Sequence, residues 1–287
     1  MSEITEALLP LTVLTPVFRG RRFLEACVEG VAAEADGRLE HLVIDGGSDD
    51  GSVEVLESLA KKYSHLRWLS EGDQGQSDAM NKGIAMAKGR FLGILNVDDH
   101  YEPGALKRVL GLMEAMPSAD KPLFLLGLCQ WWAAPGVFKE LSQAGDYSLF
   151  RSLMGAFPPN PACYFYEKSL HDLIGPYDVA DHQTMDLDFL IRARRQVELR
   201  SYDELWGHFV MHEDCKTASA EQDEVLEARK HETIERNLAK LPLHLRLGFG
   251  IFRWCETDPR ARQARFYARH PRAIGGKIRA LLSGRGL

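Results

Sequence analysis

The sequence predicts an α/β protein whose mostly parallel central sheet is flanked by helices. Strand and helix signals alternate over the first 116 residues, and a polar, glycine-containing segment follows each strand. This alternation is typical of parallel strands joined by crossover helices. The chain has 287 residues, of which 45% are hydrophobic and 26% charged, an ordinary globular composition that allows a sizeable core.

Each element of the first part has its own signal. Short apolar runs predict strands, and apolar residues at helical spacing between them predict helices. The strands are expected at 11–15, 41–45, 66–70 and 90–95, and the helices at 21–35, 53–63, 76–88 and 106–116. Ser48 or Asp49 is expected to cap the second helix, because both side chains can accept a hydrogen bond from a free N–H group.

Beyond Pro117 the regular alternation ends. We expect a strand or hairpin arm at 121–132, a short helix at 147–154, a strand at 162–166, an amphipathic helix at 185–196 and a long charged helix at 218–241. The chain is expected to consist of three parts, 1–117, 118–220 and 221–287. The first two form halves of one domain, and the third is a helical extension.

Several classes of protein do not fit the sequence. No window approaches eighteen apolar residues, so no transmembrane helix is predicted. The N-terminus has no basic region before its apolar run, so a secretory signal is not expected. The five cysteines are widely spaced and form no CxxC pair, which predicts buried or idle thiols in a reducing cytoplasm. They are Cys27, Cys129, Cys163, Cys215 and Cys255.

The ends of the predicted strands are rich in polar residues. In open sheets of this type, ligands bind beyond the carboxyl ends of the strands. The four segments that follow the strands are Thr15-Pro16-Val17-Phe18, Asp45-Gly46-Gly47-Ser48, Glu71 to Asp78, and Asn96-Val97-Asp98-Asp99. We therefore expect one crevice supplied with carboxylates and with backbone that glycine lets a ligand approach closely.

Asp98 and Asp99 form a pair of like charges at the end of a strand, where they repel each other. A divalent cation would relieve that repulsion, and carboxylate oxygens suit Mg²⁺ or Mn²⁺. Successive side chains of an extended backbone point in opposite directions, so one carboxylate can hold the metal while the other accepts from a sugar hydroxyl. The alternative is a polar turn that caps the next helix.

Five segments together resemble the family 2 glycosyltransferases, which have the Rossmann-like GT-A fold. They are LTVLTPVFRG, HLVIDGGSDDGS, GDQGQSDAMNKGIAMAKG, FLGILNVDDHYEPGAL and MDLDFLIRA. The resemblance covers residues 11 to 219. It implies that residues 1–117 bind a nucleotide-sugar donor and that residues 118–220 supply the acceptor-binding and catalytic half.

The resemblance also implies roles for individual residues. The end of the first strand would hold the base, usually uridine, close to Phe18, and Asp45 would hydrogen-bond that base. Asp98 would contact the ribose, and Asp99 would hold the metal that bridges the diphosphate. Asn96 stands where relatives often have Asp. The implied nucleotide-sugar site comprises Thr15, Pro16, Phe18, Asp45, Gly46, Gln76, Ser77, Asp78, Asn81, Asn96, Val97 and Asp98.

The segment MDLDFL supplies a second pair of carboxylates. By resemblance Asp186 is the catalytic base and Asp188 a structural partner, with Met185 standing where relatives often have Glu. Positions 186 and 188 do not share a helix face, so one can enter the site while the other pairs elsewhere. The alternative is that both lie in the first turn of a helix, where acids are favoured, with Arg192 and Arg194 as local partners.

His212 resembles a position where relatives place a histidine near the metal and the diphosphate, and His208 is the rival. Lys216 and Ser219 could reach a phosphate from the same loop. Trp131 and Trp132 could stack on an acceptor sugar or fill the core; we expect one of them in the core and leave the other open.

The implied function is metal-dependent, inverting transfer of a sugar from a nucleotide-diphospho-sugar, a UDP-sugar by preference, to a hydroxyl of a glycan or lipid-linked acceptor. Bacterial envelope or exopolysaccharide synthesis would fit. Two alternatives stay open. One is a sugar nucleotidyltransferase, for which PVFRGRR is only a faint signal, and the other is a nucleotide-sugar-binding protein without activity.

The charge is unevenly distributed along the chain. Residues 241–287 contain ten Lys or Arg and two acids, a net charge of +8, whereas the whole chain carries −6. Leu243, Leu247, Ile251 and Trp254 recur there at helical spacing among arginines. A basic amphipathic helix can lie on an anionic membrane surface, which would make a cytoplasmic protein peripheral on the inner face. A hairpin over the catalytic domain is the alternative. Nucleic acid is not expected as a partner, and the oligomeric state is not predicted.

Overall fold

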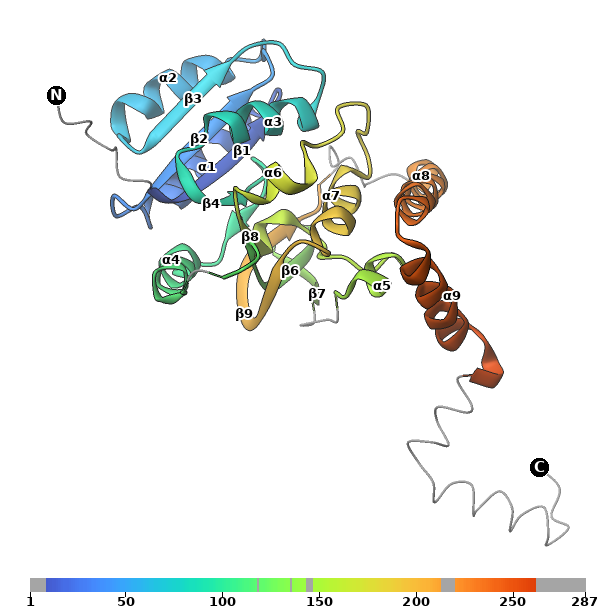
Figure 1. The fold of residues 1–287 in the computed structure, drawn as a ribbon. Coiled ribbons are helices and arrows are strands. Elements are labelled where there is room, and N and C mark those ends of the chain that lie inside the picture. The colour runs from blue at the N-terminus through green and yellow to red at the C-terminus, as the bar shows by residue number, and fades with distance from the viewer. Residues whose placement is uncertain (1–8, 118, 135, 143–146, 213–219, 262–287) are drawn as a thin grey trace, which may run out of the picture. The chain divides into compact units, whose positions relative to one another are not determined.

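The computed structural model describes residues 9–117, 119–134, 136–142, 147–212 and 220–261 (Figure 1). The chain divides into two compact units, Met1–Ile234 and Glu235–Leu287. The first unit contains the whole sheet, so the predicted ligand crevice belongs to it.

One mixed sheet forms the centre of the first unit. Its strands are β1 (Leu9–Val17), β2 (Leu39–Asp45), β3 (Leu66–Ser70), β4 (Gly89–Ile94), β5 (His100–Tyr101), β6 (Leu123–Ala134), β7 (Val137–Leu141), β8 (Tyr164–Glu167) and β9 (Glu198–Val210). They lie in the order β3-β2-β1-β4-β8-β6-β9-β5, with β7 paired to β6. The first four strands are mutually parallel, and β8 is antiparallel to both of its neighbours. The predicted α/β class is confirmed.

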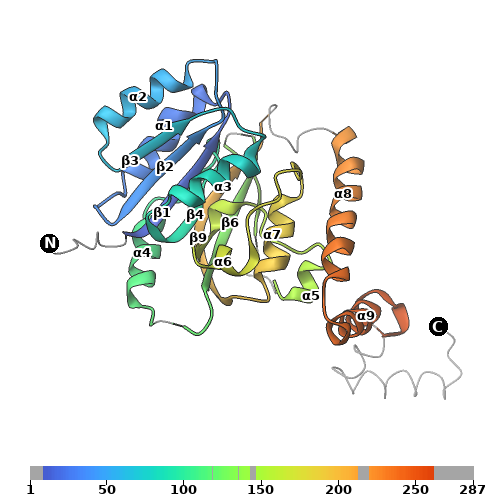
Figure 2. The ribbon, with the colours of Figure 1, turned by 45° about the horizontal axis from the view of Figure 1, so that its top comes forward.

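Helices connect the strands and cover both faces of the sheet. They are α1 (Arg21–Ala32), α2 (Ser52–Lys62), α3 (Gln76–Met86), α4 (Ala105–Ala115), α5 (Leu149–Ser152), the 3₁₀ turn η1 (Pro161–Cys163), α6 (Leu170–Ile174) and α7 (Met185–Ala193). Two further helices, α8 (Ala220–Ala239) and α9 (Leu243–Thr257), follow the last strand. Figure 2 shows α3, α6 and α7 along one face of the sheet.

The alternation of side chains along each strand divides the core between the two faces. Leu14, Leu42 and Ile44 are fully buried in a cluster with residues of α3 and α7. Leu11 packs on the other face with α1 and α4, and Val43 packs there with α1 and α2. Because the parallel strands are covered on both faces, they form nearly continuous apolar runs, as the sequence indicated.

The register of the parallel strands brings their carboxyl ends to one edge. Val17 of β1 pairs with Asp45 of β2, and Asp45 pairs with Ser70 of β3. On the other side of β1, Leu14 pairs with Ile94, so the segment after β4 begins beside the end of β1. The polar segments after the strands therefore start as neighbours.

The predicted cap of α2 is wrong. Helix α2 follows Gly51, whose φ of +88° suits glycine and which has no side chain to cap the helix. Asp50 instead accepts hydrogen bonds from the backbone N and the hydroxyl of Ser52. Ser48 and Asp49 instead bind Arg19 in the loop after β1, and Gly51 is the residue that directly precedes the helix.

Three strands were not predicted from the sequence. β9 is the longest strand, but its first half is polar and partly exposed, so it carries no apolar run. β5 has only two residues and is defined by its pairing with β9. All five residues of β7 are exposed, and it exists as the outer arm of a hairpin with β6.

Among the described residues, no helix is long and apolar enough to cross a membrane. In the second unit, α9 carries an exposed apolar row, and Phe249 on another side of the helix is buried.

Replacing Gly207 of β9 with alanine should destabilise the first unit by about 1–3 kcal/mol. The added Cβ would lie 2.7 Å from the backbone C and O atoms of Ala162, and backbone there cannot move aside. Gly111→Ala, at an exposed position of helix α4, is the control. Its Cβ would meet no atom within 4 Å, so this substitution should stabilise by about 0.5–1 kcal/mol. Urea unfolding curves measure both. Equal midpoints for the two variants would contradict this packing.

Candidate active site

The loop after β1 exposes an aromatic ring at the edge of the sheet. Phe18 is 61% exposed, and the Arg19 guanidinium carbon lies 5.3 Å from the centre of its ring. Arg19 has a φ of +52°, and its side chain donates two hydrogen bonds to Asp49. The backbone N of Arg19 also donates to the Ser48 hydroxyl. These bonds fix the loop so that the Phe18 ring is available to stack on a planar ligand.

Thr15 and Pro16, predicted beside Phe18, are buried in β1. The Thr15 hydroxyl lies 2.9 Å from Nε2 of the buried His41. Burial lowers the pKa of His41 to about 3, so this imidazole is neutral. The Thr15 side chain is thus used inside the core, and a ligand could meet this residue only through its backbone.

Asp45 organises the end of β2 with both carboxylate oxygens. It accepts hydrogen bonds from the backbone N atoms of Gly47 and Ser48 and from the hydroxyls of Ser48 and Ser70. The next residue, Gly46, lies against the Asp73 carboxylate, which a Cβ would approach to 2.6 Å. Binding of a base by Asp45 stays a prediction, and in this structure the side chain holds two strand ends together.

The start of α3 joins three parts of the site. Gln76 Nε2 donates to Asn96 Oδ1 over 3.0 Å. The Ser77 hydroxyl donates to the Asp181 carbonyl and contacts Met185 Sδ at 3.0 Å. Helix α3 therefore connects the segment after β4 with the start of α7. These contacts connect the segments that bear the two predicted carboxylate pairs.

Asp78 and Asn81 mainly support this arrangement. Asp78 accepts from the backbone N of Gln74 and lies 3.5 Å from Lys82 Nζ. Asn81 exchanges two hydrogen bonds with the backbone of Tyr177, each 2.9 Å long. Both were predicted as nucleotide-binding residues, and both side chains are engaged with protein groups here.

The hydrogen bonds of Asn96 explain why this position holds asparagine where relatives often have aspartate. Its side-chain oxygen accepts from Gln76, and its side-chain nitrogen donates to Asp99 Oδ2 over 2.9 Å. An aspartate could not make the second bond and would add a third carboxylate beside Asp98 and Asp99. The next residue, Val97, is half-buried against Gly20.

Asp99 is a buried carboxylate with one unused oxygen. It is 3% exposed, and Oδ2 accepts from Asn96 and from Asn160 Nδ2 at 2.8 Å. Oδ1 is buried and has no hydrogen-bond partner among the described residues. Burial, and then the charge of Asp98, raises the pKa of Asp99 to about 7. A cation would relieve both causes of this shift.

His212 is the histidine that contacts the aspartate pair. Its Nε2 lies 2.8 Å from Asp98 Oδ2, and Arg22 Nη2 lies 3.1 Å from its Nδ1. His208 lies in a separate cluster, where its Nε2 contacts Glu102 at 2.6 Å and its Nδ1 accepts from Trp132 Nε1. Of the two rivals, His212 is therefore the one beside Asp98.

The two acids of α7 have different environments. Asp188 is buried and accepts from Arg192 Nε over 2.6 Å, one helical turn later. Asp186 is half-exposed, and its charge contributes to raising the pKa values of the buried tyrosines Tyr164 and Tyr177, after the larger effect of burial. Arg192 therefore pairs with Asp188, and Asp186 is the more accessible of the two carboxylates.

The residues fit a divalent cation. Within the described parts of the chain, no three His, Cys, Asp or Glu side chains form a ready-made metal cluster. Mg²⁺, however, is usually bound through only one or two carboxylates together with substrate phosphates. Asp99 Oδ1 is buried and has no hydrogen-bond partner among the described residues. Asp98 precedes Asp99 in the chain, and His212 contacts the Asp98 carboxylate. Asp99 would be the main ligand, with His212 as a second.

The sequence did not single out Asn160 and Arg22. Asn160, 61 positions after Asp99, donates to its carboxylate, and its own oxygen caps η1 through the Ala162 backbone N. The local signal was an asparagine between prolines in FPPNP, which predicts a turn but not its distant partner.

Lys216 and Ser219, the two residues predicted to reach a phosphate, lie outside the described residues.

Neither tryptophan of β6 is in the core. Trp131 and Trp132 are both half-buried. Lys139 Nζ lies 3.8 Å from the centre of the Trp131 ring, and Trp132 donates to His208. The expectation that one of them fills the core is wrong, because both extend past the buried half of their long strand.

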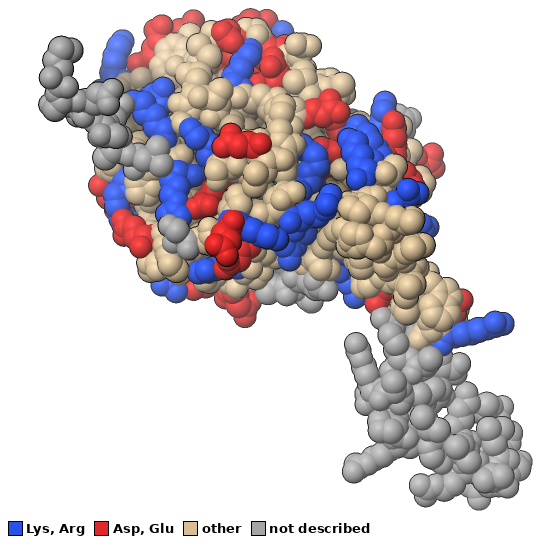
Figure 3. Space-filling model, viewed as in Figure 1, with Lys and Arg blue, Asp and Glu red and all other residues tan. Residues whose placement is uncertain are grey.

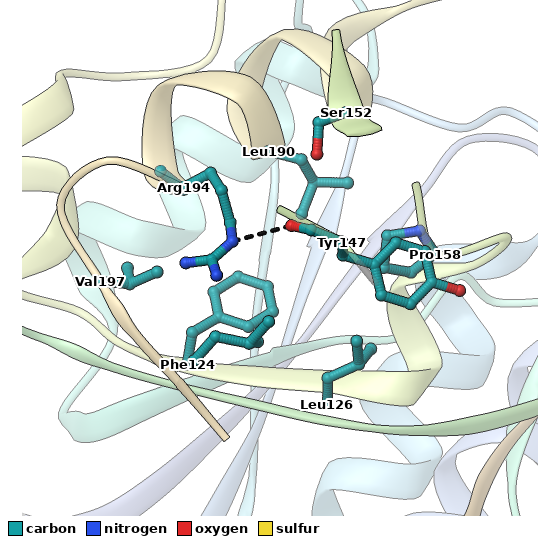
Figure 4. A pocket seen from close by; sticks show the side chains of 10 residues that line it. Phe124, Leu126, Tyr147, Ser152, Pro158, Leu190, Arg194 and Val197 are labelled. Atoms are coloured by element: carbon teal, nitrogen blue, oxygen red, sulfur yellow. Dashed lines mark hydrogen bonds between the residues drawn. The ribbon is translucent and has the colours of Figure 1, made fainter. Parts of the chain in front are cut away.

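A pocket lined mainly by apolar residues lies away from the aspartates. Phe124, Leu126, Leu190 and Val197 line it, and Arg194 Nε donates to the Tyr147 carbonyl over 2.7 Å beside it (Figure 4). It meets the last turn of α7, whereas Asp186 lies in the first turn. This pocket is therefore separate from the predicted donor site.

Comparison with known proteins identifies relatives of this chain. The family described as "Glycosyl transferase family 2" matches residues 12–120. The chain is 30% identical over 185 residues to the uncharacterized glycosyltransferase Rv1514c of Mycobacterium tuberculosis, which covers 64% of this chain and 68% of that protein. It is 32% identical over 93 residues to the uncharacterized glycosyltransferase YibD of Escherichia coli, which is 32% of this chain and 27% of YibD.

Two solved structures share the fold. Residues 1–349 of S. aureus TarS in complex with UDP-GlcNAc align with a TM-score of 0.60 and 15% identity, covering 82% of this chain and 68% of that one. The mannosyltransferase PcManGT from Pyrobaculum calidifontis, in complex with GDP-Man and Mn²⁺, aligns with a TM-score of 0.52 and 16% identity, covering 97% and 89%. The chain belongs to glycosyltransferase family 2, and its fold is of the GT-A type.

The pKa of Asp99 predicts an unusual dependence of stability on pH. In chelator, an unfolded aspartate loses its proton near pH 3.9, whereas folded Asp99 loses it near pH 7. Wild-type stability should therefore fall as the pH rises from 4 to 7, by at most about 4 kcal/mol from this group. The Asp99→Asn variant should not show this decrease in stability. The control variant Asp203→Asn, at an exposed position, should show the same decrease as the wild type. Urea unfolding at several pH values measures the difference. Parallel curves for wild type and Asp99→Asn would contradict the assignment.

Proposed function

We propose that the chain is a metal-dependent, inverting glycosyltransferase. It transfers a sugar from a nucleotide-diphospho-sugar to a hydroxyl of a glycan or lipid-linked acceptor, as in envelope polysaccharide synthesis. UDP-sugars are the first donors to test. The observation that carries the proposal is the cluster of Asp98, buried Asp99 and His212. Hydrogen bonds of Asn96, Gln76 and Ser77 connect this cluster to the first turn of α7, which bears Asp186.

Several features support a nucleotide-sugar donor. The exposed Phe18 ring stands at the end of β1, where a base could stack. Asp98 is partly exposed and can accept from a ribose hydroxyl. Of the two aligned structures, TarS is in complex with UDP-GlcNAc, and PcManGT is in complex with GDP-Man and Mn²⁺. These two ligands differ in their base. The base that this chain prefers therefore depends on the residues of its own loops.

Asp186 is proposed as the general base. Its carboxylate takes the proton from the acceptor hydroxyl while that oxygen attacks C1 of the donor sugar. The bond between C1 and the diphosphate oxygen breaks, and the nucleoside diphosphate leaves with the bonding electrons. Asp188 does not compete for this role, because Arg192 engages it.

The surrounding residues orient this chemistry. Ser77 holds the start of α7 through Met185 and Asp181, so Asp186 has a fixed place relative to α3. Gln76 donates to Asn96, and Asn96 donates to the Asp99 carboxylate. A divalent cation held by Asp99 would supply Lewis-acid stabilisation of the leaving diphosphate. A single direct displacement inverts the configuration at the anomeric carbon.

Asp186→Asn should abolish transfer and leave nucleotide binding nearly intact. Loss of a general base costs about 10²–10⁴ in rate, and the substitution keeps the shape of the side chain. The measurement is release of nucleoside diphosphate from a panel of nucleotide sugars with Mn²⁺ and a hydroxyl acceptor, with calorimetry of nucleotide binding in parallel.

Asp188→Asn is the contrasting variant. Because it breaks the buried pair with Arg192, it should lower the thermal midpoint more than Asp186→Asn does. Equal losses of binding and transfer in Asp186→Asn would sink its assignment as base. Release of pyrophosphate by the wild type would reject the proposed reaction in favour of nucleotidyl transfer.

A further inference from the structure

Helix α9 carries an exposed apolar stripe that the proposed reaction does not use. Leu243, Leu247, Ile251 and Trp254 follow each other at intervals of four, four and three residues, so they lie on one side of the helix. Each is between 56% and 68% exposed. Figure 3 shows a largely tan surface over the segment labelled α9 in Figure 1. Four large apolar side chains in a row are more than scattered surface residues.

This stripe is distinct from the side of α9 that is buried. Phe249 is 3% exposed, and Leu245, Phe252 and Cys255 are half-buried. On a helix with about 100° between successive residues, these positions lie away from the stripe. The helix therefore has one apolar side that the fold covers and a second apolar side that it leaves open.

Arginines lie along one flank of the stripe. Arg246 directly precedes Leu247, and Arg253 directly precedes Trp254. Since they are seven residues apart, the two arginines share a side of the helix, and both are exposed. Acids are absent from this flank within the described helix, whose only acid is half-buried Glu256. Long basic side chains beside an apolar stripe can extend to lipid headgroups while the stripe enters the acyl region.

The charge of the chain around α9 indicates which kind of partner covers the apolar stripe. Residues 241–287 have a net charge of +8, whereas the rest of the chain carries −14. A second copy of the same strongly basic segment would bring like charges together, and an anionic lipid surface would compensate them. Tryptophan beside arginine is also the pairing found at the membrane–water interface.

We propose that the stripe of α9 and its flanking arginines dock this protein on an anionic lipid surface. The stripe is buried parallel to the surface, and the basic residues contact the headgroups. The docking surface is Leu243, Arg246, Leu247, Ile251, Arg253 and Trp254. Docking needs no sugar donor, so it can be tested independently of the proposed reaction.

The test is co-sedimentation of the full chain with vesicles. One set contains equal parts of phosphatidylglycerol and phosphatidylcholine, and the other contains phosphatidylcholine only. The wild type should bind the anionic vesicles and should lose most of that binding in high salt or without phosphatidylglycerol. Absence of binding to anionic vesicles, or equal binding to both sets, would overturn the proposal.

Variants separate the two contributions to docking. Leu247→Asn with Ile251→Asn should weaken binding to anionic vesicles about tenfold or more. Arg246→Gln with Arg253→Gln should weaken it by a similar factor at low salt. The matched control is Val137→Asn with Phe138→Asn, two apolar residues of β7 with similar exposure, 54% and 57%, which should bind as the wild type does.

Alternative occupants of the stripe give different results. If a second copy covers it, the wild type is a dimer that the α9 apolar variant dissociates, and vesicles do not compete. If another part of the chain covers it, the protein is a monomer that does not sediment with vesicles. Either result rejects lipid docking. Thermal melting of each variant identifies loss of binding that is caused by unfolding.

Discussion

The site depends on a carboxylate that the fold buries without satisfying it. Asp99 is held by amide groups of Asn96 and Asn160, and both donate to the same oxygen. The other oxygen is buried and has no partner among the described residues. Leaving an anionic oxygen in this state costs free energy unless a proton or a cation compensates it. The arrangement is therefore costly for the fold alone, and the proposed cation would compensate that cost.

Much of the remaining site follows from keeping Asp99 in position. Asn96 occupies the place of a more frequent aspartate because it must donate on one side and accept from Gln76 on the other. Gln76 belongs to the start of α3, and its neighbour Ser77 holds the start of α7. The proposed base, Asp186, is thus connected to the proposed metal ligand through one short series of side chains. This connection gives the two carboxylate pairs fixed relative positions without placing them on the same element.

The parallel half of the fold could be predicted from the sequence, because each strand is a short apolar run and each helix has its own periodicity. β3 was predicted residue for residue. The second half was less predictable. β9 is polar over its first half, and β5 has two residues, so both are defined by pairing between distant segments. The same reason explains why Asn160 was missed, since its contact with Asp99 is a product of the tertiary fold. Asp45 and Asn81 show a different limit of prediction from sequence. Their motifs were recognised, but the hydrogen bonds that their side chains make within the protein were not.

The central claim is that Asp99 holds a cation together with a nucleotide. Calorimetric titration with UDP, GDP, CMP and dTDP, each in Mn²⁺ and in chelator, tests it on the wild type and on Asp99→Asn. We expect one nucleotide to bind with Mn²⁺ and to bind about tenfold or more weakly in chelator. Asp99→Asn should keep only the weak binding. If none of the four nucleotides binds a folded sample, or if Mn²⁺ has the same effect on the wild type and on Asp99→Asn, the assignment of this site is wrong.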